Sequence, residues 1–237
     1  MIEIPVYVSA VFIACVIAAF GFLYYAVKVA AGRKNRSIAP LVALIGMLSW
    51  IALHSALSLN GFFADYEALP PRLFLFVGLC LLIIIGLFAT NRSRDFLARM
   101  PITTLTYVHL IRVPVEIVLW WLFLSEMVPE TLTFAGMNYD ILSGITAPFA
   151  GIFLVEKKRR NRLGAIIWNI LALGLLITIV GMAISATPLF TSPAQGVILN
   201  LAIFEFPFTL LPLFVVPVVL FSHLISLYQL LFVKEED

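Results

Sequence analysis

Charged residues and cysteines are both scarce in this sequence. Only 12% of its 237 residues are charged, against about 25% in a typical globular chain. Two cysteines are too few for a disulfide-rich secreted scaffold. Hydrophobic residues make up 62% of the sequence, which excludes a disordered chain and exceeds what a soluble protein of this length can bury. The composition therefore predicts a multi-pass membrane protein.

Seven apolar runs along the sequence approach or exceed the length of about 20 residues that crosses a bilayer. Lipid offers the backbone no hydrogen-bond partners, and runs such as Leu79–Ile85 lack the alternation of β-barrel strands. We therefore predict an all-α fold, with one domain (1–237) of seven transmembrane helices. The predicted spans are 6–30, 38–62, 72–90, 102–125, 141–155, 163–186 and 198–232.

The connections between these spans differ in charge. Nearly all lysines and arginines fall in the first, third and fifth connections and in the C-terminal tail. By the positive-inside rule this side is cytoplasmic, so the N-terminus lies outside and the C-terminus inside. The first apolar run is too long for a cleavable signal peptide. We expect an integral protein of the bacterial plasma (inner) membrane, surrounded by the lipid bilayer, with no nucleic-acid partner.

Three connections carry further signals. The segment 91–101 has apolar side chains among its arginines, which is typical of a segment on the membrane surface. The basic cluster Lys157–Arg162 is a possible binding site for anionic lipid, although a plain role in topology is the favoured interpretation. The loop Pro129–Asp140 is either a lid over an outward-facing cavity or, as we favour, a simple connector.

Ionisable side chains inside the spans are the candidates for function. Each costs about 2.5–3.5 kcal/mol to insert, so such groups usually face the bundle interior. His109, Arg112 and Glu116 have the spacing i, i+3, i+7, which places them on one helix face. Arg112 and Glu116 are four residues apart, so they can pair within the helix.

Depth estimates indicate which of these groups share a level. At about 1.5 Å per residue, His54, Glu116 and Glu205 each lie roughly 20 Å from the cytoplasmic boundary. We therefore predict a ligand-binding pocket that opens to the outside. Its walls are His54, Arg112, Glu116 and Glu205, with Asp65 and Asp140 at the mouth, and a second polar level lies below it at His109, His223 and Asn169.

Three functional hypotheses follow from this pocket. The favoured one is a protein that binds or transports a small or lipid-like ligand, in which Arg112 neutralises Glu116 or grips an anionic group. Glu205 or His54 would carry the proton in a coupled step, since histidine titrates near neutral pH. The alternative is an intramembrane enzyme, possibly metal-dependent, that acts on a lipid or isoprenoid. The third is a structural or assembly protein without a ligand.

No cofactor is predicted, although zinc and haem stay as less favoured alternatives. Membrane hydrolases of the adiponectin-receptor and alkaline-ceramidase type carry paired histidines on the last helix, whereas this sequence has His223 with Val219 and Leu227. The sequence contains neither HxxxH nor HExxH, so we predict no metal site. The last span contains no lysine at bilayer depth for a retinal Schiff base. His109 and His223 are the candidates for haem ligation.

Overall fold

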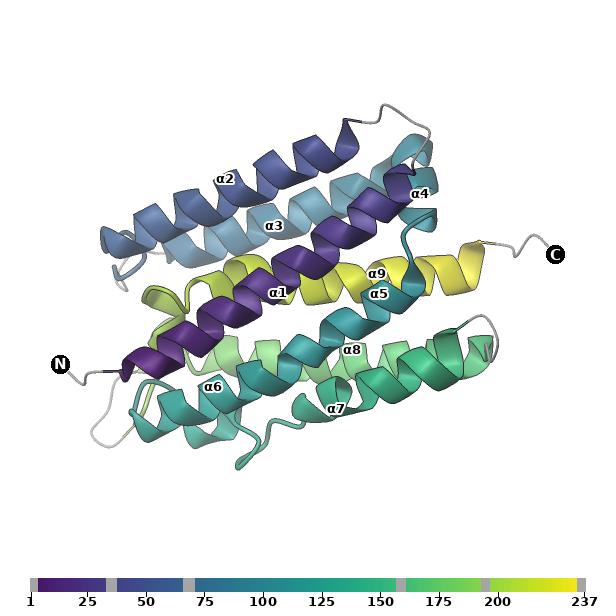
Figure 1. Cartoon of the computed structure of the whole chain (residues 1–237). Coiled ribbons are helices and arrows are strands. Elements are labelled where there is room, and N and C mark those ends of the chain that lie inside the picture. The colour runs from purple at the N-terminus through teal and green to yellow at the C-terminus, as the bar shows by residue number, and fades with distance from the viewer. Residues whose placement is uncertain (1–3, 33–37, 66–70, 157–160, 193–196, 234–237) are drawn as a thin grey trace.

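The computed structural model is a bundle of helices (Figure 1). It describes residues 4–32, 38–65, 71–156, 161–192 and 197–233. Helices account for 77% of the structure, and these ranges contain no strand. The predicted all-α class is therefore confirmed.

Six helical segments are long and apolar enough to cross a membrane. They include two composite segments, in which a 3-10 or π turn is continuous with an α-helix. The six are α1 (Val6–Ala31), α2 (Ala39–Leu59), α3 (Arg72–Ala89), α5–η1–α6 (Ile102–Tyr107, Val108–Ile111 and Arg112–Leu124), α8 (Arg162–Ser185) and η6–α9 (Leu211–Val215 and Val216–Phe232).

The remaining helices are shorter. The fifth predicted span corresponds to α7 (Ile141–Ala150) and the π-helical turn η3 (Gly151–Val155), which together form an apolar helix below the length of the other six. A surface segment was expected at 91–101, and the structure has the helix α4 (Asn91–Ala98) there, whose Leu97 is buried. Short 3-10 turns complete the fold at η2 (Glu130–Leu132) and η5 (Ala202–Phe204).

The last span begins later than predicted. The sequence predicts a helix from residue 198, whereas the structure has turns up to Leu210 and a helix only from Leu211. Pro207 and Pro212 lack the N–H that a helix needs, and proline disfavours helical backbone in the residue before it. Pro212 stands in the first turn of the helix, where the missing N–H is not needed.

A third proline in this segment attaches α2 and α3 to α9. Pro217 has no N–H to offer the carbonyl of Leu213, four residues earlier. Trp50 Nε1 of α2 donates a hydrogen bond to that carbonyl at 2.8 Å, and Cys80 Sγ of α3 donates to it at 3.4 Å. The carbonyl that proline leaves free thus becomes the point at which two other helices are held.

Two glycines bring α7 close to the segment α5–η1–α6. A Cβ at Gly144 would lie 2.7 Å from Val113 Cγ2, and a Cβ at Gly151 would lie 2.7 Å from the ring of Tyr107. Small residues on one helix face allow such close approach in membrane bundles. This packing brings the start of α7, where Asp140 lies, against the start of α6.

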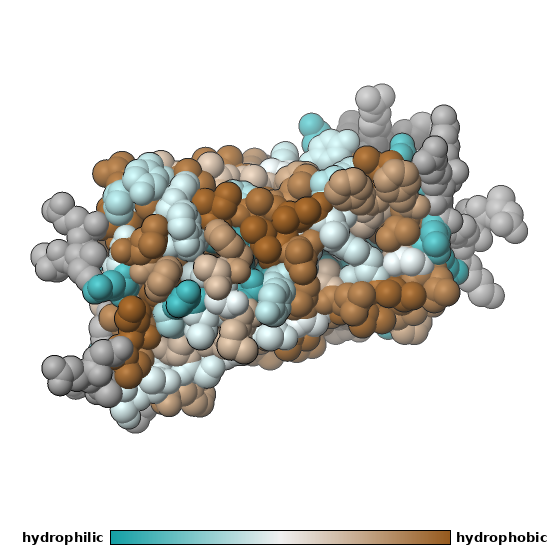
Figure 2. All heavy atoms as spheres, turned by 90° about the horizontal axis from the view of Figure 1, so that it is seen from below, coloured by the Kyte–Doolittle hydropathy of each residue, from teal (hydrophilic) through white to brown (hydrophobic). Residues whose placement is uncertain are grey.

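The helices differ in how much of each is buried within the protein, and α2 and α3 lie together along one side of the bundle (Figure 1). We call α2 and α3 the α2–α3 layer; these helices meet through His54 and Phe76, whose ring centroids are 4.9 Å apart. Only 11% of the α2 span and 17% of the α3 span are buried, against 50% of Ile102–Leu124 and 56% of Leu211–Phe232. The face seen in Figure 2 is mostly brown or pale along its length, with teal side chains mainly toward the ends.

Candidate functional site

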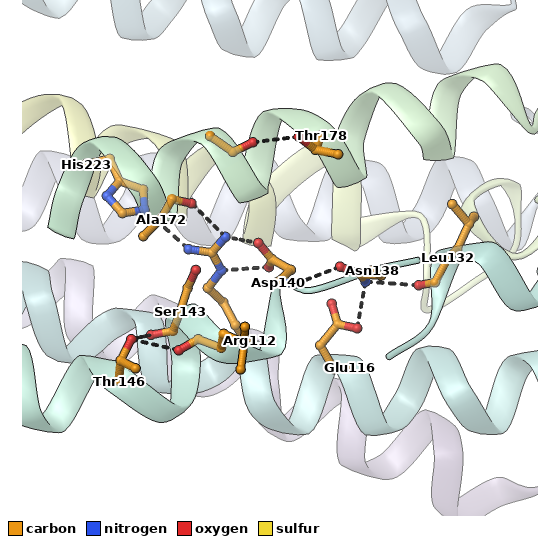
Figure 3. A network of polar contacts seen from close by, with 12 residues as sticks. Arg112, Glu116, Leu132, Asn138, Asp140, Ser143, Thr146, Ala172, Thr178 and His223 are labelled. Carbon is orange, nitrogen blue, oxygen red and sulfur yellow. Dashed lines mark hydrogen bonds and ion pairs between the residues drawn. The ribbon is translucent and has the colours of Figure 1, made fainter. Parts of the chain in front are cut away.

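Arg112 is the centre of a buried polar network (Figure 3). Its side chain is 3% exposed, and its Nε donates a hydrogen bond to Asp140 Oδ2 at 2.6 Å while Nη2 pairs with Oδ1. Nη2 also donates to the carbonyl of Ala172 in α8 at 3.1 Å. Nη1 lies 3.3 Å from His223 Nε2 in α9. One guanidinium therefore joins α6 to the start of α7, to α8 and to α9.

The hydrogen bonds of His223 fix the position of its proton. An arginine only donates hydrogen bonds, so His223 Nε2 must accept from Arg112. Its Nδ1 then carries the proton and donates to Asn169 Oδ1 at 2.9 Å. Asn169 Nδ2 in turn donates to the carbonyl of Ala165 at 2.9 Å. His223 is therefore neutral and oriented by partners on both sides.

His109 lies against this network without hydrogen bonds. Its ring stacks on His223 with centroids 3.9 Å apart and meets Trp168 edge-on at 5.4 Å. Neither ring nitrogen has a partner among the described residues, although the side chain is fully buried. The structure thus brings His109, His223 and Asn169 together. Because the two imidazoles stack face to face, an iron ion cannot lie between them as in a bis-histidine haem.

Asn138 links Asp140 to Glu116. Its Nδ2 donates to Glu116 Oε2 at 2.6 Å and to the carbonyl of Leu132 at 3.0 Å, and its Oδ1 accepts from the N–H of Asp140 at 2.9 Å. The spacing of Arg112 and Glu116 allowed them to pair along the helix. Instead Asp140 accepts from Nε and Nη2 of the guanidinium, because the loop 129–140 folds into the bundle.

Glu116 and Asp140 line a cavity of about 130 Å³ between α3, α6, α8 and the segment that leads into α9. We call it the Glu116 cavity. Asn200 also lines it, and nearly all the remaining wall is aliphatic or aromatic. Glu116 Oε1 accepts no hydrogen bond from the described residues, and Asn200 Oδ1 is buried without a partner there. Two residues of this largely apolar wall therefore carry an oxygen acceptor without a partner in the described part of the chain.

The predicted convergence of His54, Glu116 and Glu205 is wrong. Glu205 is exposed and lies before the last helix, so the depth estimate, which assumed a continuous helix from 198, does not apply. His54 is buried among the rings of Trp50, Phe63 and Phe76. Its Nδ1 donates to the carbonyl of Trp50 at 2.7 Å. Neither His54 nor Glu205 lines the Glu116 cavity.

Asp65 does not stand at the mouth of the cavity either. Its carboxylate pairs with Arg72 at 2.8 Å, and both side chains are about 40% exposed (39% and 41%). Arg72 also donates to the carbonyl of Phe62 at 3.1 Å and lies over its ring. Asp65 therefore ties the end of α2 to the start of α3. Asp140, the other predicted mouth residue, is buried in the network.

The sequence argument missed the two amides of the site. Asn138 lies in the loop 129–140, for which a simple connector was favoured, and the signal in the sequence was an amide two residues before Asp140. Asn200 falls at the start of the predicted seventh span, where one amide among apolar residues was the available signal.

Other sequence expectations concern cations and metals. In the proposed lipid cluster Lys157–Arg162, residues 157–160 lie outside the described residues. Arg162 is described, and its Nε donates to the carbonyl of Leu230 at 2.6 Å. The described part of the chain holds no group of three metal-ligating side chains.

The chain belongs to the family described as "Domain of unknown function (DUF8737)", whose model matches residues 69–231, more than half of the sequence. No curated protein and no solved structure matches it. The matched range includes Arg112, Glu116, Asn138, Asp140 and His223, whereas α1 and α2 precede it.

Proposed function

We propose that this protein binds a small or lipid-like ligand in the Glu116 cavity, through a cationic or hydrogen-bond-donating group of the ligand. One observation carries the proposal: Glu116 lines a largely apolar cavity, and one oxygen of its carboxylate has no hydrogen-bond partner among the described residues. A buried acceptor without a partner carries a desolvation cost that a ligand donor would remove.

Charge balance supports this ligand chemistry. Arg112 and Asp140 neutralise each other through a two-armed ion pair. Glu116 receives one hydrogen bond from a neutral amide and no ion pair from the described residues. An ionised Glu116 therefore leaves the site with excess negative charge, which favours an ammonium or another donor over an anionic group. This reverses the expectation that Arg112 grips an anion.

The volume of the cavity limits which part of the ligand can enter it. A cavity of about 130 Å³ is close to the roughly 150 Å³ of an apolar cavity that binds benzene. The cavity thus suits one six-membered ring or a comparable fragment, such as the head of a longer amphiphile. Asn200 would offer a second acceptor to the same polar group.

The proposal places this site in a protein of seven spans with its N-terminus outside. Ile141–Val155 would be the seventh span in addition to the six longer ones. At about 1.5 Å per residue it covers roughly 22 Å, and the inward-folded loop 129–140 would fill the remaining depth. Among the described basic residues, Lys28, Arg92, Arg94, Arg99 and Arg162 fall at the end of the bundle that holds α4, which supports a cytoplasmic position for that end. The bacterial plasma membrane stays a prediction of the sequence.

Three soluble probes of equal ring size test the ligand chemistry: benzylammonium, benzyl alcohol and benzoate. We expect benzylammonium to raise the Tm of the purified protein in detergent by about 5–10 °C at about 100-fold its Kd. Benzyl alcohol should give a smaller shift and benzoate none. Glu116→Gln should remove the shift with benzylammonium, since the amide keeps the acceptor for Asn138 but not the charge.

Glu205→Gln is the matched control, because Glu205 is exposed and outside the cavity. It should keep the full response to benzylammonium. Equal shifts with all three probes, or an unchanged response in Glu116→Gln, would contradict the proposal. The absence of any benzylammonium shift in the wild-type protein would favour the structural hypothesis instead.

A further inference from the structure

A second and larger cavity lies between the α2–α3 layer and the rest of the bundle. Its volume is about 610 Å³, within the roughly 300–1,000 Å³ of ligand sites. We call it the α2–α3 groove. Its walls come from α1, α2, α3, α4 and α9, and it shares no lining residue with the Glu116 cavity.

The lining of this groove is apolar along most of its length. Two polar atoms at one end, Trp50 Nε1 and Cys80 Sγ, are both engaged with the carbonyl of Leu213. Gly46 stands on the α2 wall, and a Cβ built there meets no atom within 4 Å. The groove therefore has an apolar interior with room for a chain of methylene groups.

The length of the groove matches one leaflet of a bilayer. On α2 its wall runs from Ala39 to Trp50, which is about 16 Å at 1.5 Å per residue. This is about half of the roughly 30 Å hydrocarbon core. One end lies where α2 begins, and the other lies near the middle of the bundle, where Trp50 and Cys80 meet Leu213.

The end of the groove at α4 is cationic. Ser93 and Phe96 of α4 line it, and the guanidinium of Arg99 lies over the Phe96 ring, 5.7 Å from its centroid. Arg92, next to Ser93, is exposed. Arg94 is also on α4, whereas Asp95 is the only acidic residue of that helix. An apolar channel of leaflet length with a cationic end is complementary to an anionic lipid.

We propose that the α2–α3 groove binds one acyl chain of an anionic phospholipid, with its phosphate against Arg92 and Arg99. The acyl chain is buried in the groove at the depth of the hydrocarbon core. The arginines provide the preference for a negative headgroup. This site does not depend on the Glu116 cavity, because no residue lines both cavities and the two ligands differ in charge.

The test measures lipid retention by native mass spectrometry on the full chain in detergent. The probes are phosphatidylglycerol and phosphatidylcholine with identical acyl chains. We expect the wild-type protein to bind phosphatidylglycerol about tenfold more tightly, and excess inorganic phosphate not to displace it. Equal affinity for both lipids would overturn the proposal. Displacement by inorganic phosphate would show that the headgroup alone binds, and would also overturn it.

Two variants separate the chain from the headgroup. Gly46→Leu fills the groove and should weaken phosphatidylglycerol binding by about tenfold. Gly174→Leu on α8 is the control, because Gly174 also has no atom within 4 Å of a built Cβ and does not line the groove. An unchanged affinity in Gly46→Leu would exclude the groove as the site.

The double variant Arg92→Gln/Arg99→Gln changes only exposed side chains, so it tests the site even where Gly46→Leu fails to fold. It should bind both lipids alike. A retained preference for phosphatidylglycerol would exclude Arg92 and Arg99 as the headgroup site.

Discussion

The α2–α3 layer and the region around α6, α7, α8 and α9 differ in how deeply their helices are buried and in how polar their interiors are. The helices of the layer are largely unburied within the protein, and their Trp50 and Cys80 side chains both donate to one carbonyl, that of Leu213 in η6. The other region is closely packed and encloses an ion pair, three asparagines and two histidines. The difference teaches that the Arg112 network lies where several helices pack closely enough to supply its partners, whereas the loosely packed layer borders an apolar groove.

Arg112→Met should have the largest effect on stability. It leaves Asp140 buried without its counter-ion, which costs about 3–5 kcal/mol of unfolding free energy. The double variant Arg112→Met/Asp140→Leu should recover most of this loss. The measurement is chemical denaturation in mixed micelles.

The ion pair of the α2–α3 layer provides the comparison. Arg72→Met removes the partner of Asp65, which is 41% exposed at the side chain, so the loss should be about 1 kcal/mol or less. Equal losses in Arg112→Met and Arg72→Met would mean that the two regions do not differ in burial as described.

A second comparison uses alanine at two glycines. Gly144→Ala places a Cβ 2.7 Å from Val113 Cγ2 and 3.0 Å from its backbone nitrogen, so we expect a loss of about 1–3 kcal/mol. Gly78→Ala on α3 meets nothing within 4 Å and should stabilise the helix by about 0.5–1 kcal/mol. Thermal unfolding of the two variants shows whether each substitution raises or lowers the stability. A stabilised Gly144→Ala would argue against the close approach of α7.

The most local effect is expected for Trp50→Phe. It removes the hydrogen bond to the Leu213 carbonyl, worth about 1 kcal/mol, and keeps an aromatic ring. Hydrogen–deuterium exchange should accelerate in α2 and stay unchanged in α9. Trp121→Phe is the control, since its indole N–H has no hydrogen-bond partner among the described residues. Unchanged exchange in α2 would mean that this contact does not hold the layer.

The sequence correctly predicted that part of the site faces the interior of the bundle. The spacing of His109, Arg112 and Glu116 indicated one inward face, and all three are buried. It did not indicate that Arg112 pairs with Asp140, because that depends on how the loop 129–140 folds into the bundle. The depth of Glu205 was wrong because the prolines delay the start of the last helix.

Composition alone determined that this chain is helical and apolar enough for a membrane, because every backbone group in hydrocarbon must find a partner within its own helix. Periodicity determined which face of 102–124 is polar. Only the tertiary structure decided which polar groups meet, since Arg112, Asn138, Asn169 and His223 come from separate segments that helix packing brings together. Hydropathy indicates how deep in the membrane a residue lies. Whether its side chain points toward the other residues of a site depends on how the helices pack.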